Sequence, residues 1–191
     1  MLTDLLLLII DAVTGFFTAI LLARFYMQWA RVSFRNQLGQ FVIQLTDWVV
    51  VPARRVVPSA GGLDLATLVV AWLLQALLAW VIFALRGQAA MLGFSVFAAS
   101  LGIGFFEVLR LSVWFLIVVV LVGAVMSWVA PYHPIAGVLN SISRPFLRPF
   151  QRIVPTVANI DLSPLVLLLV LQIVLYLLAR LQAGVVPALA M

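Results

Sequence analysis

Residues 52–58 read Pro52-Ala53-Arg54-Arg55-Val56-Val57-Pro58, and Asp64-Leu65 then begin an apolar run that reaches Gln75. The same plan recurs over 149–172, where Pro149-Phe150-Gln151-Arg152-Ile153-Val154-Pro155 precedes Asp161-Leu162 and an apolar run to Gln172. Each counterpart lies 97 residues downstream (Pro52 and Pro149, Asp64 and Asp161), and a Met-x-Trp signature precedes each copy, at Met27-Gln28-Trp29 and Met126-Ser127-Trp128. The chain is therefore an internal duplication, which allows each residue to be compared with its counterpart.

The composition is that of an integral membrane protein. Hydrophobic residues make up 66% of the chain and charged residues 9%, whereas soluble domains are roughly half apolar and about a quarter charged. The absence of Cys excludes disulfides, Cys-based zinc sites and thiol catalysis. The net charge of +5 comes from arginines spread along short loops beside apolar segments. That pattern sets orientation and attracts anionic lipid head groups, so no nucleic-acid partner is expected.

Four segments are long and apolar enough to cross a bilayer, which takes about 20 residues. They are residues 5–29, 65–85, 109–130 and 162–183. The N-terminus lacks the basic region and small-residue cleavage site of a signal peptide, so the first segment is expected to be retained. The predicted fold class is an all-α membrane protein with four transmembrane helices in two parallel repeats.

Residues 88–106 are apolar but carry Gly93, Gly102 and Gly104, and their placement decides the topology. A full crossing would put the two arginine-bearing loops, 30–63 and 131–160, on opposite faces. These loops hold seven arginines and the opposite side holds three, so the positive-inside bias places both loops in the cytoplasm. We therefore expect a re-entrant or interfacial segment, giving a first repeat at 1–87, a central segment at 88–108 and a second repeat at 109–191.

Both loops contain amphipathic stretches. In 138–154, apolar residues recur at helical spacing while Arg144, Arg148 and Arg152 form a separate stripe. The first loop is similar, with Phe41, Leu45 and Trp48 on one face. The pattern predicts helices in the head-group plane with their arginines toward phosphates, so the candidate lipid- or partner-binding residues are Arg54, Arg55, Arg144, Arg148 and Arg152.

Asp64 and Asp161 each directly precede an apolar residue that begins a predicted span. A carboxylate there accepts hydrogen bonds from the first-turn N–H groups and meets the positive end of the helix dipole. The alternative is a paired carboxylate site for a cation or proton. Arg55 and Arg152 are candidates to pair with these two acids.

Four further polar side chains fall inside the predicted spans. Gln75 and Gln172 are counterparts near the bilayer midplane, suited to an interhelical hydrogen bond or to a polar pore lining. Asp11 and Glu107 have no counterparts and are expected to face a partner or the bundle interior. Glu107 can pair with Arg110 on one helical face, and Asp11 with Arg86 or Arg110. Arg24 is expected to extend to the cytoplasmic surface.

Enzymatic chemistry has no recognisable basis in the sequence. We find no nucleotide-binding loop, no Ser/His/Asp set and no cluster of metal ligands, and His133 is the single histidine. The sequence therefore predicts a protein without catalytic residues, cofactor or metal.

The repeated motif resembles the YggT (YlmG) family of bacterial inner-membrane proteins. The residues that carry the resemblance are Pro52, Arg54, Arg55, Pro58, Gly62 and Asp64, then Pro149, Arg152, Pro155 and Asp161. The second copy departs from the pattern with Gln151 and Asn159. The resemblance implies a multi-pass inner-membrane protein linked to osmotic-stress tolerance, cation uptake, or division and envelope organisation. A role in cytochrome maturation, found among chloroplast relatives, transfers poorly to a chain without Cys.

Two functions are consistent with these features. The leading hypothesis is a non-enzymatic scaffold or assembly factor whose arginine-bearing cytoplasmic helices bind anionic lipid and a membrane or cytoplasmic protein. The rival is a small cation channel or transporter subunit lined by Asp11, Gln75, Glu107 and Gln172. Four spans leave little room for a wide pore, so transport would require a homo-oligomer.

Overall fold

A computed structural model describes residues 1–58, 63–85, 94–153 and 161–189. These residues form helices α1 (Leu2–Trp29), α2 (Gln37–Ala53), α3 (Leu65–Leu85), α4 (Phe94–Val129), α5 (Pro134–Gln151) and α6 (Ser163–Leu189). Within the described ranges no strand is present, which confirms the all-α class. Four helices, α1, α3, α4 and α6, are long and apolar enough to cross a membrane. The chain is therefore a multi-pass membrane protein.

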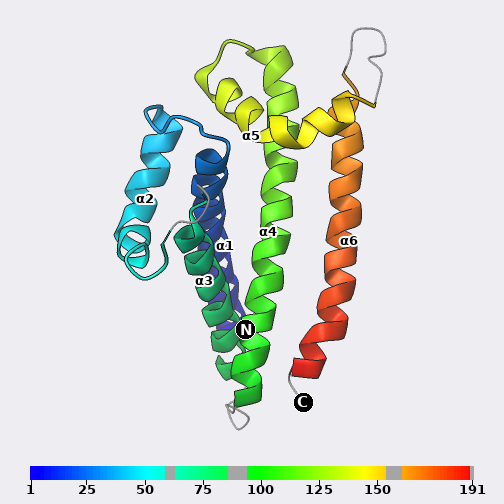
Figure 1. The fold of residues 1–191 in the computed structure, drawn as a ribbon. Helices are drawn as coiled ribbons and strands as arrows, with labels where there is room; N and C mark the ends of the chain where they lie inside the picture. The colour runs from blue at the N-terminus through cyan, green and yellow to red at the C-terminus, as the bar shows by residue number, and fades with distance from the viewer. Residues whose placement is uncertain (59–62, 86–93, 154–160, 190–191) are drawn as a thin grey trace.

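The four long helices run alternately up and down, and the two shorter helices sit toward one end of the bundle. Figure 1 shows both termini at the opposite end, with α2 following α1 and α5 following α4. Since α3 returns the chain to the end where α1 began, α2 and α5 belong to the same side of the bundle. This agrees with the expected placement of the two arginine-bearing loops on one face.

The expected re-entrant segment is wrong for residues 94–106, which form the first part of the continuous helix α4. Residues 88–93 of that expectation lie outside the described chain. The physical reason is close helix packing. A Cβ added to Gly104 would lie 2.5 Å from the backbone nitrogen of Ala76 on α3, so Gly104 permits direct backbone approach. The indole N–H of Trp72 also donates to the Leu101 carbonyl at 2.9 Å.

Helix α4 is longer than the bilayer core. Its 36 residues extend about 54 Å at 1.5 Å per residue, against a hydrocarbon thickness of about 30 Å. It packs against α1 and α3 of the first repeat and against α5 and α6 of the second. The helix therefore contacts elements of both repeats.

Aromatic side chains hold the first repeat against the second near the end that carries α5. Tyr26 of α1 stacks on Phe115 of α4 with ring centroids 5.4 Å apart, and it meets Phe146 of α5 edge-on at 6.1 Å. The Tyr26 hydroxyl also shares a hydrogen bond with Ser112. Tyr26 is 8% exposed, so this contact belongs to the core that spans both repeats.

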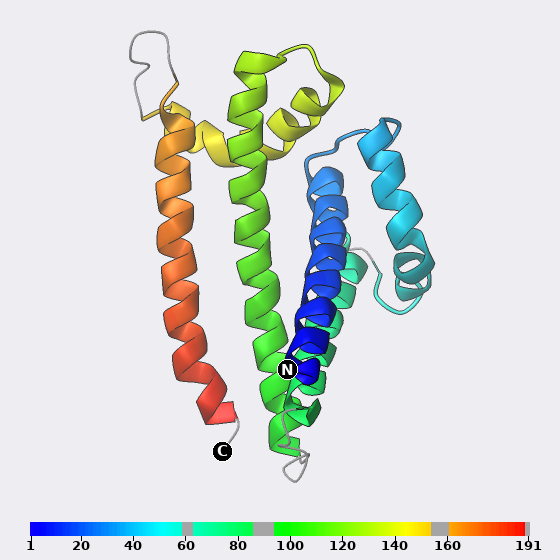
Figure 2. The same ribbon diagram turned by 180° about the vertical axis from the view of Figure 1, so that it is seen from behind.

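The two shorter helices are oriented differently. Helix α5 lies across the end of the bundle, whereas α2 stands beside α1 and α3, as the two opposite views in Figures 1 and 2 show. The head-group-plane orientation expected for both helices is therefore not the one that α2 adopts. Contacts of α2 with α1, including Phe17 with Trp48 at a centroid distance of 5.9 Å, hold it upright.

Candidate functional site: a buried arginine–aspartate network

Arg24 is buried inside the protein and does not extend to the surface as expected. The residue is 5% exposed, and one of its terminal nitrogens donates to Thr46 Oγ1 at 2.6 Å and to Asp47 Oδ1 at 2.7 Å. Both acceptors are on α2. Because a buried guanidinium must be paired to offset its lost hydration, Arg24 ties α2 to α1.

Asp64 is the second buried charge of the same network and is 1% exposed. Its Oδ1 accepts a hydrogen bond from Arg54 Nε at 3.3 Å, and its Oδ2 accepts from Arg54 NH2 at 2.5 Å. Thr67 Oγ1 donates to the same Oδ2 at 2.7 Å, and Arg24 Nε lies 3.9 Å away. The fork of Arg54, not Arg55, therefore holds Asp64, in the bidentate geometry that favours arginine.

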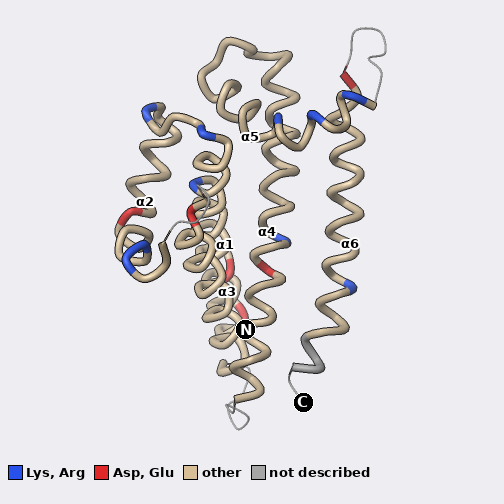
Figure 3. Tube along the Cα trace, viewed as in Figure 1, with Lys and Arg blue, Asp and Glu red and all other residues tan. Residues whose placement is uncertain are grey.

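The pairing of Arg54 with Asp64 favours the charged forms of both groups. Burial raises the pKa of Asp64, but the hydrogen bonds from Arg54 and Thr67 outweigh it, so the pKa lies below its ordinary value. The hydrogen bond to Asp64 raises the pKa of Arg54. Two guanidiniums and two carboxylates thus balance where α1, α2 and α3 meet, the charged cluster visible in Figure 3.

The second repeat retains the aspartate of the network as Asp161 but has Gln151 in place of Arg54. Asp161 is exposed; its Oδ2 accepts from Gln151 Nε2 at 2.9 Å and its Oδ1 from the Ser163 backbone N–H at 2.8 Å. The hydrogen bonds from Ser163, aided by that from Gln151, hold the pKa of Asp161 below its ordinary value against a smaller effect of burial. Gln151 is the counterpart of Arg54. Arg152 is exposed and does not take that place.

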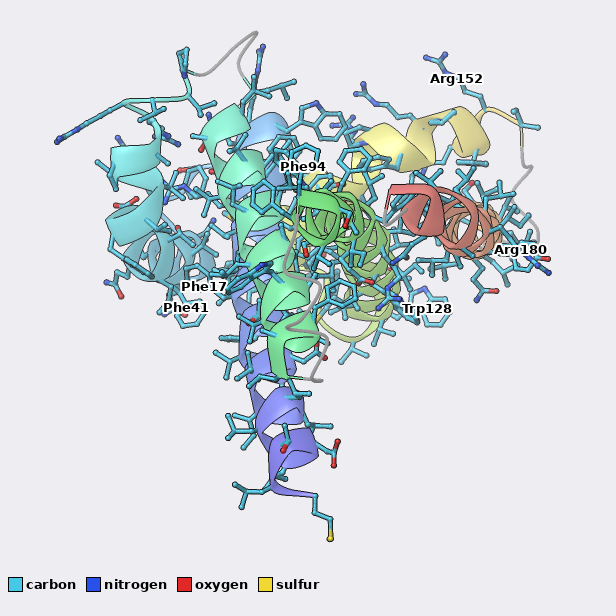
Figure 4. All side chains as sticks on the ribbon, turned by 90° about the horizontal axis from the view of Figure 1, so that it is seen from below. Phe17, Phe41, Phe94, Trp128, Arg152 and Arg180 are labelled. Atoms are coloured by element: carbon cyan, nitrogen blue, oxygen red, sulfur yellow. The ribbon has the colours of Figure 1, made fainter. Side chains whose placement is uncertain are left out.

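The remaining predicted arginines lie on the surface. Arg55, Arg144, Arg148 and Arg152 are all exposed, and Figure 3 shows basic positions spaced along α5. Figure 4 shows the bundle from below the view of Figure 1. Arg152 extends outward from α5 and Arg180 extends outward from α6. The underside of α5 buries Val138, Ile142 and Leu147.

Three of the four predicted intramembrane polar residues line one cavity. Asp11, Gln75 and Glu107 surround a space of about 290 Å³ together with Arg110. Arg110 forms an ion pair with Glu107 at 3.0 Å, and Gln75 Nε2 donates to Thr18 Oγ1 of α1 at 2.9 Å. Gln172 is exposed on α6 and lies apart from them. Arg86, one expected partner of Asp11, is outside the described residues.

Among the described residues no group of three His, Cys, Asp or Glu side chains is placed to hold a metal ion. His133 precedes α5, where its Nδ1 accepts from the Ile135 backbone N–H at 3.3 Å. Its counterpart Asn36 does the same at α2, accepting from Gly39 N–H at 2.7 Å. The two residues therefore begin equivalent helices.

Comparison with known proteins assigns the family. The model of the family described as CCB3/YggT matches residues 3–85 and 103–182. The chain belongs to this CCB3/YggT family. It is 36% identical over 170 residues to the uncharacterized protein YggT of Escherichia coli (strain K12), covering 87% of this chain and 85% of the relative.

Other bacterial relatives of this CCB3/YggT protein show similar coverage. An uncharacterized protein encoded in the proC 3' region of Vibrio alginolyticus is 33% identical over 165 residues, covering 86% of this chain and 88% of the relative. An uncharacterized protein of Pseudomonas aeruginosa is 32% identical over 179 residues, with 87% and 84% covered. No solved structure matches the chain.

Sequence reasoning missed three members of the buried network: Arg24, Thr46 and Asp47. The sequence did contain a signal that Arg24 is paired inside the bundle. Arg24, followed by Phe25 and Tyr26, lies within an otherwise apolar span, and a charged residue in a span usually faces a partner. Asp47 lies on α2. Nothing in its spacing from Arg24 indicates that α2 folds back along α1.

Proposed function

We propose that this CCB3/YggT protein is a non-enzymatic scaffold or assembly factor of the bacterial inner membrane. In this proposal its arginine-bearing helices lie on the cytoplasmic side, where they bind anionic lipid head groups and a protein partner. The lipid would be held chiefly by α5 and the partner docked beside it.

The observation that carries the proposal is the two-sided character of α5. Its inner side buries Val138, Ile142 and Leu147 against the bundle, and its outer side exposes Arg144 and Arg148. Arginine presents a planar fork that binds phosphate oxygens in pairs. A rigid helix carrying such forks at the end of a membrane bundle fits a surface that recruits anionic groups.

The same structure explains why Arg54 is a poor test of this surface. Its side chain is committed to Asp64, so replacing it would disturb the fold and the surface together. A sharper variant changes Arg144→Gln and Arg148→Gln, which removes two charges without breaking a hydrogen bond that holds the bundle. The matched control, Arg31→Gln with Arg35→Gln, removes the same charge from two exposed arginines between α1 and α2.

The experiment places a photo-crosslinking amino acid at Ser141, an exposed position on α5, in cells that express each variant. The scaffold proposal expects a discrete protein adduct that is lost in the Arg144/Arg148 variant and retained in the control, with equal insertion of all forms. An unchanged adduct pattern in the Arg144/Arg148 variant would overturn the arginine surface as the recruiting element.

A second candidate function is passage of a cation or proton. The cavity lined by Asp11, Gln75 and Glu107 favours it, because two carboxyl groups inside a membrane bundle are costly and face functional paths by default. Its ion pair, Glu107 with Arg110, is equally consistent with a structural role. Gln172 contributes nothing to this lining.

Reconstituted protein distinguishes the two roles of this cavity. Transport expects cation or proton flux into liposomes that falls strongly with Asp11→Asn or Glu107→Gln, while Gln172→Leu, outside the cavity, leaves flux unchanged. Flux equal to that of empty liposomes, with folded protein shown to be present, would reject transport by this chain alone.

A further inference from the structure

A cavity of about 490 Å³ lies in the second repeat where α4, α5 and the start of α6 meet. Its position is the counterpart of the buried arginine–aspartate network of the first repeat. Residues of that network have counterparts that line this cavity: Gln28 corresponds to Ser127, Thr46 to Ser143, Arg54 to Gln151, Asp64 to Asp161 and Thr67 to Pro164. One architectural site is thus built twice.

The two copies differ in what fills them. Arg24 lies three residues before Met27, and the residue three before Met126 is Gly123, which lines the cavity. In the first repeat the Arg24 side chain occupies the site, bonded to Thr46 and 3.9 Å from Asp64. In the second repeat the glycine removes that side chain.

The lining retains acceptors suited to a guanidinium group. Asp161 is the charged residue among those that line the cavity, and Ser143 and Asn140 add hydroxyl and amide oxygens. Arg144 and Arg148 are exposed on α5 and do not line the cavity.

We propose that this cavity binds a guanidinium-bearing ligand, which takes the place that Arg24 occupies in the first repeat. The guanidinium would pair with the Asp161 carboxylate and donate to Ser143, as Arg24 donates to Thr46. The site is independent of the scaffold proposal, because it rests on the comparison of the two repeats and not on the surface of α5.

A substitution within the chain can supply the guanidinium group and so test the site. A Cβ added at Gly123 would meet only Leu139 Cβ at 3.6 Å, an ordinary contact, so Gly123→Arg places a guanidinium within reach of the cavity without a backbone clash. Gly123→Gln is the matched control, since it supplies a polar side chain of similar helix propensity without the charge. The arginine variant is expected to unfold at a higher temperature than the glutamine variant. Asp161→Asn should abolish that difference.

The ligand itself is represented by n-propylguanidinium, with neutral n-propylurea as the control, added at millimolar concentration to the purified wild-type protein. Propylguanidinium is expected to bind and raise the unfolding temperature, whereas propylurea is not. Asp161→Asn should weaken binding about tenfold, because it removes a charge-assisted hydrogen bond. Gly123→Arg should abolish binding by occupying the site.

A photo-crosslinker at Ser127 in cells identifies the source of the group. A protein adduct that disappears in Gly123→Arg and persists in Gly123→Gln assigns the guanidinium to an arginine of a partner. Binding of propylguanidinium without such an adduct assigns it to a soluble guanidino compound. Equal effects of propylguanidinium and propylurea, together with equal stability of the Arg and Gln variants, would overturn the proposal.

Discussion

Gln151 donates to Asp161 across 2.9 Å, at the register at which Arg54 holds Asp64 in the first repeat. The two pairs share a position, and they differ in charge and burial. Asp64 is 1% exposed and is held by a guanidinium fork, whereas Asp161 is exposed and is held by a neutral amide. Duplication has therefore preserved the turn that leads into the membrane while only one copy retains a buried ion network.

Asp64→Asn is expected to destabilise the protein strongly. It would leave Arg24 and Arg54 without their shared carboxylate, and breaking a buried pair costs about 3–5 kcal/mol. The lower end applies, since the Arg54 side chain is 40% exposed and solvent screens it. Thermal unfolding of the purified protein measures the loss. Asp161→Asn is the matched control and should change the midpoint much less; equal losses would contradict the different roles of the two acids.

The Asp64 pair should also confer a pH dependence. Its pKa in the folded protein lies below the ordinary value, which is about 3.9 for an unfolded aspartate. The contribution to stability is therefore fully present above about pH 5 and is lost as the pH falls through the lower, folded pKa. Unfolding midpoints measured from pH 7 to pH 3 should fall more steeply for wild type than for Asp64→Asn. Parallel curves would show that Asp64 does not carry this linkage.

The duplication, the four spans and the shared end of the two arginine-bearing loops could be predicted from the sequence, because they depend on hydropathy and on the repeat. The continuous helix formed by residues 94–106 could not be predicted in this way. The arginine count led to a segment that does not cross the membrane, with its glycines as a feature of broken structure, whereas Gly104 serves close approach to Ala76 within a continuous helix. A glycine in an apolar segment has both uses, and only the neighbouring helix decides between them.

The buried network was partly predictable. Asp64 stood out because the motif repeats it as Asp161, and Arg54 belongs to the same motif without being repeated. The motif also offered Arg55 as the partner, and only the folded structure shows which guanidinium reaches the acid. Arg24 and Asp47 belong to different helices, and their pairing depends on α2 standing beside α1. Local patterning contains no information on that tertiary arrangement. The replacement of Arg24 by Gly123 in the second repeat can be read from the sequence, but the cavity that Gly123 lines is known only from the structure.

Gly104→Ala is expected to destabilise the contact between α3 and α4. The new Cβ would lie 2.5 Å from the Ala76 backbone nitrogen, so the helices must separate, and overpacking of this kind costs about 1–3 kcal/mol. Gly15→Ala is the matched control, because a Cβ there meets nothing within 4 Å and alanine favours the helix by up to about 1 kcal/mol. Unfolding midpoints should move in opposite directions. A neutral Gly104→Ala would show that α3 and α4 do not cross closely.

Single cysteines at Val56 and Ile153 test whether α2 and α5 end on the same side of the membrane. The chain contains no Cys, and these two residues are 82% and 80% exposed just beyond the two helices. Because α1 and α4 lead into α2 and α5 from the same end of the bundle, and the scaffold proposal puts that end in the cytoplasm, both thiols should be protected from an impermeant maleimide added to intact spheroplasts and should react after permeabilisation. Leu2→Cys, 80% exposed at the opposite end, should react before permeabilisation. Labelling of only one of the two loop cysteines from outside would require an odd number of crossings between them and would overturn the four-span arrangement.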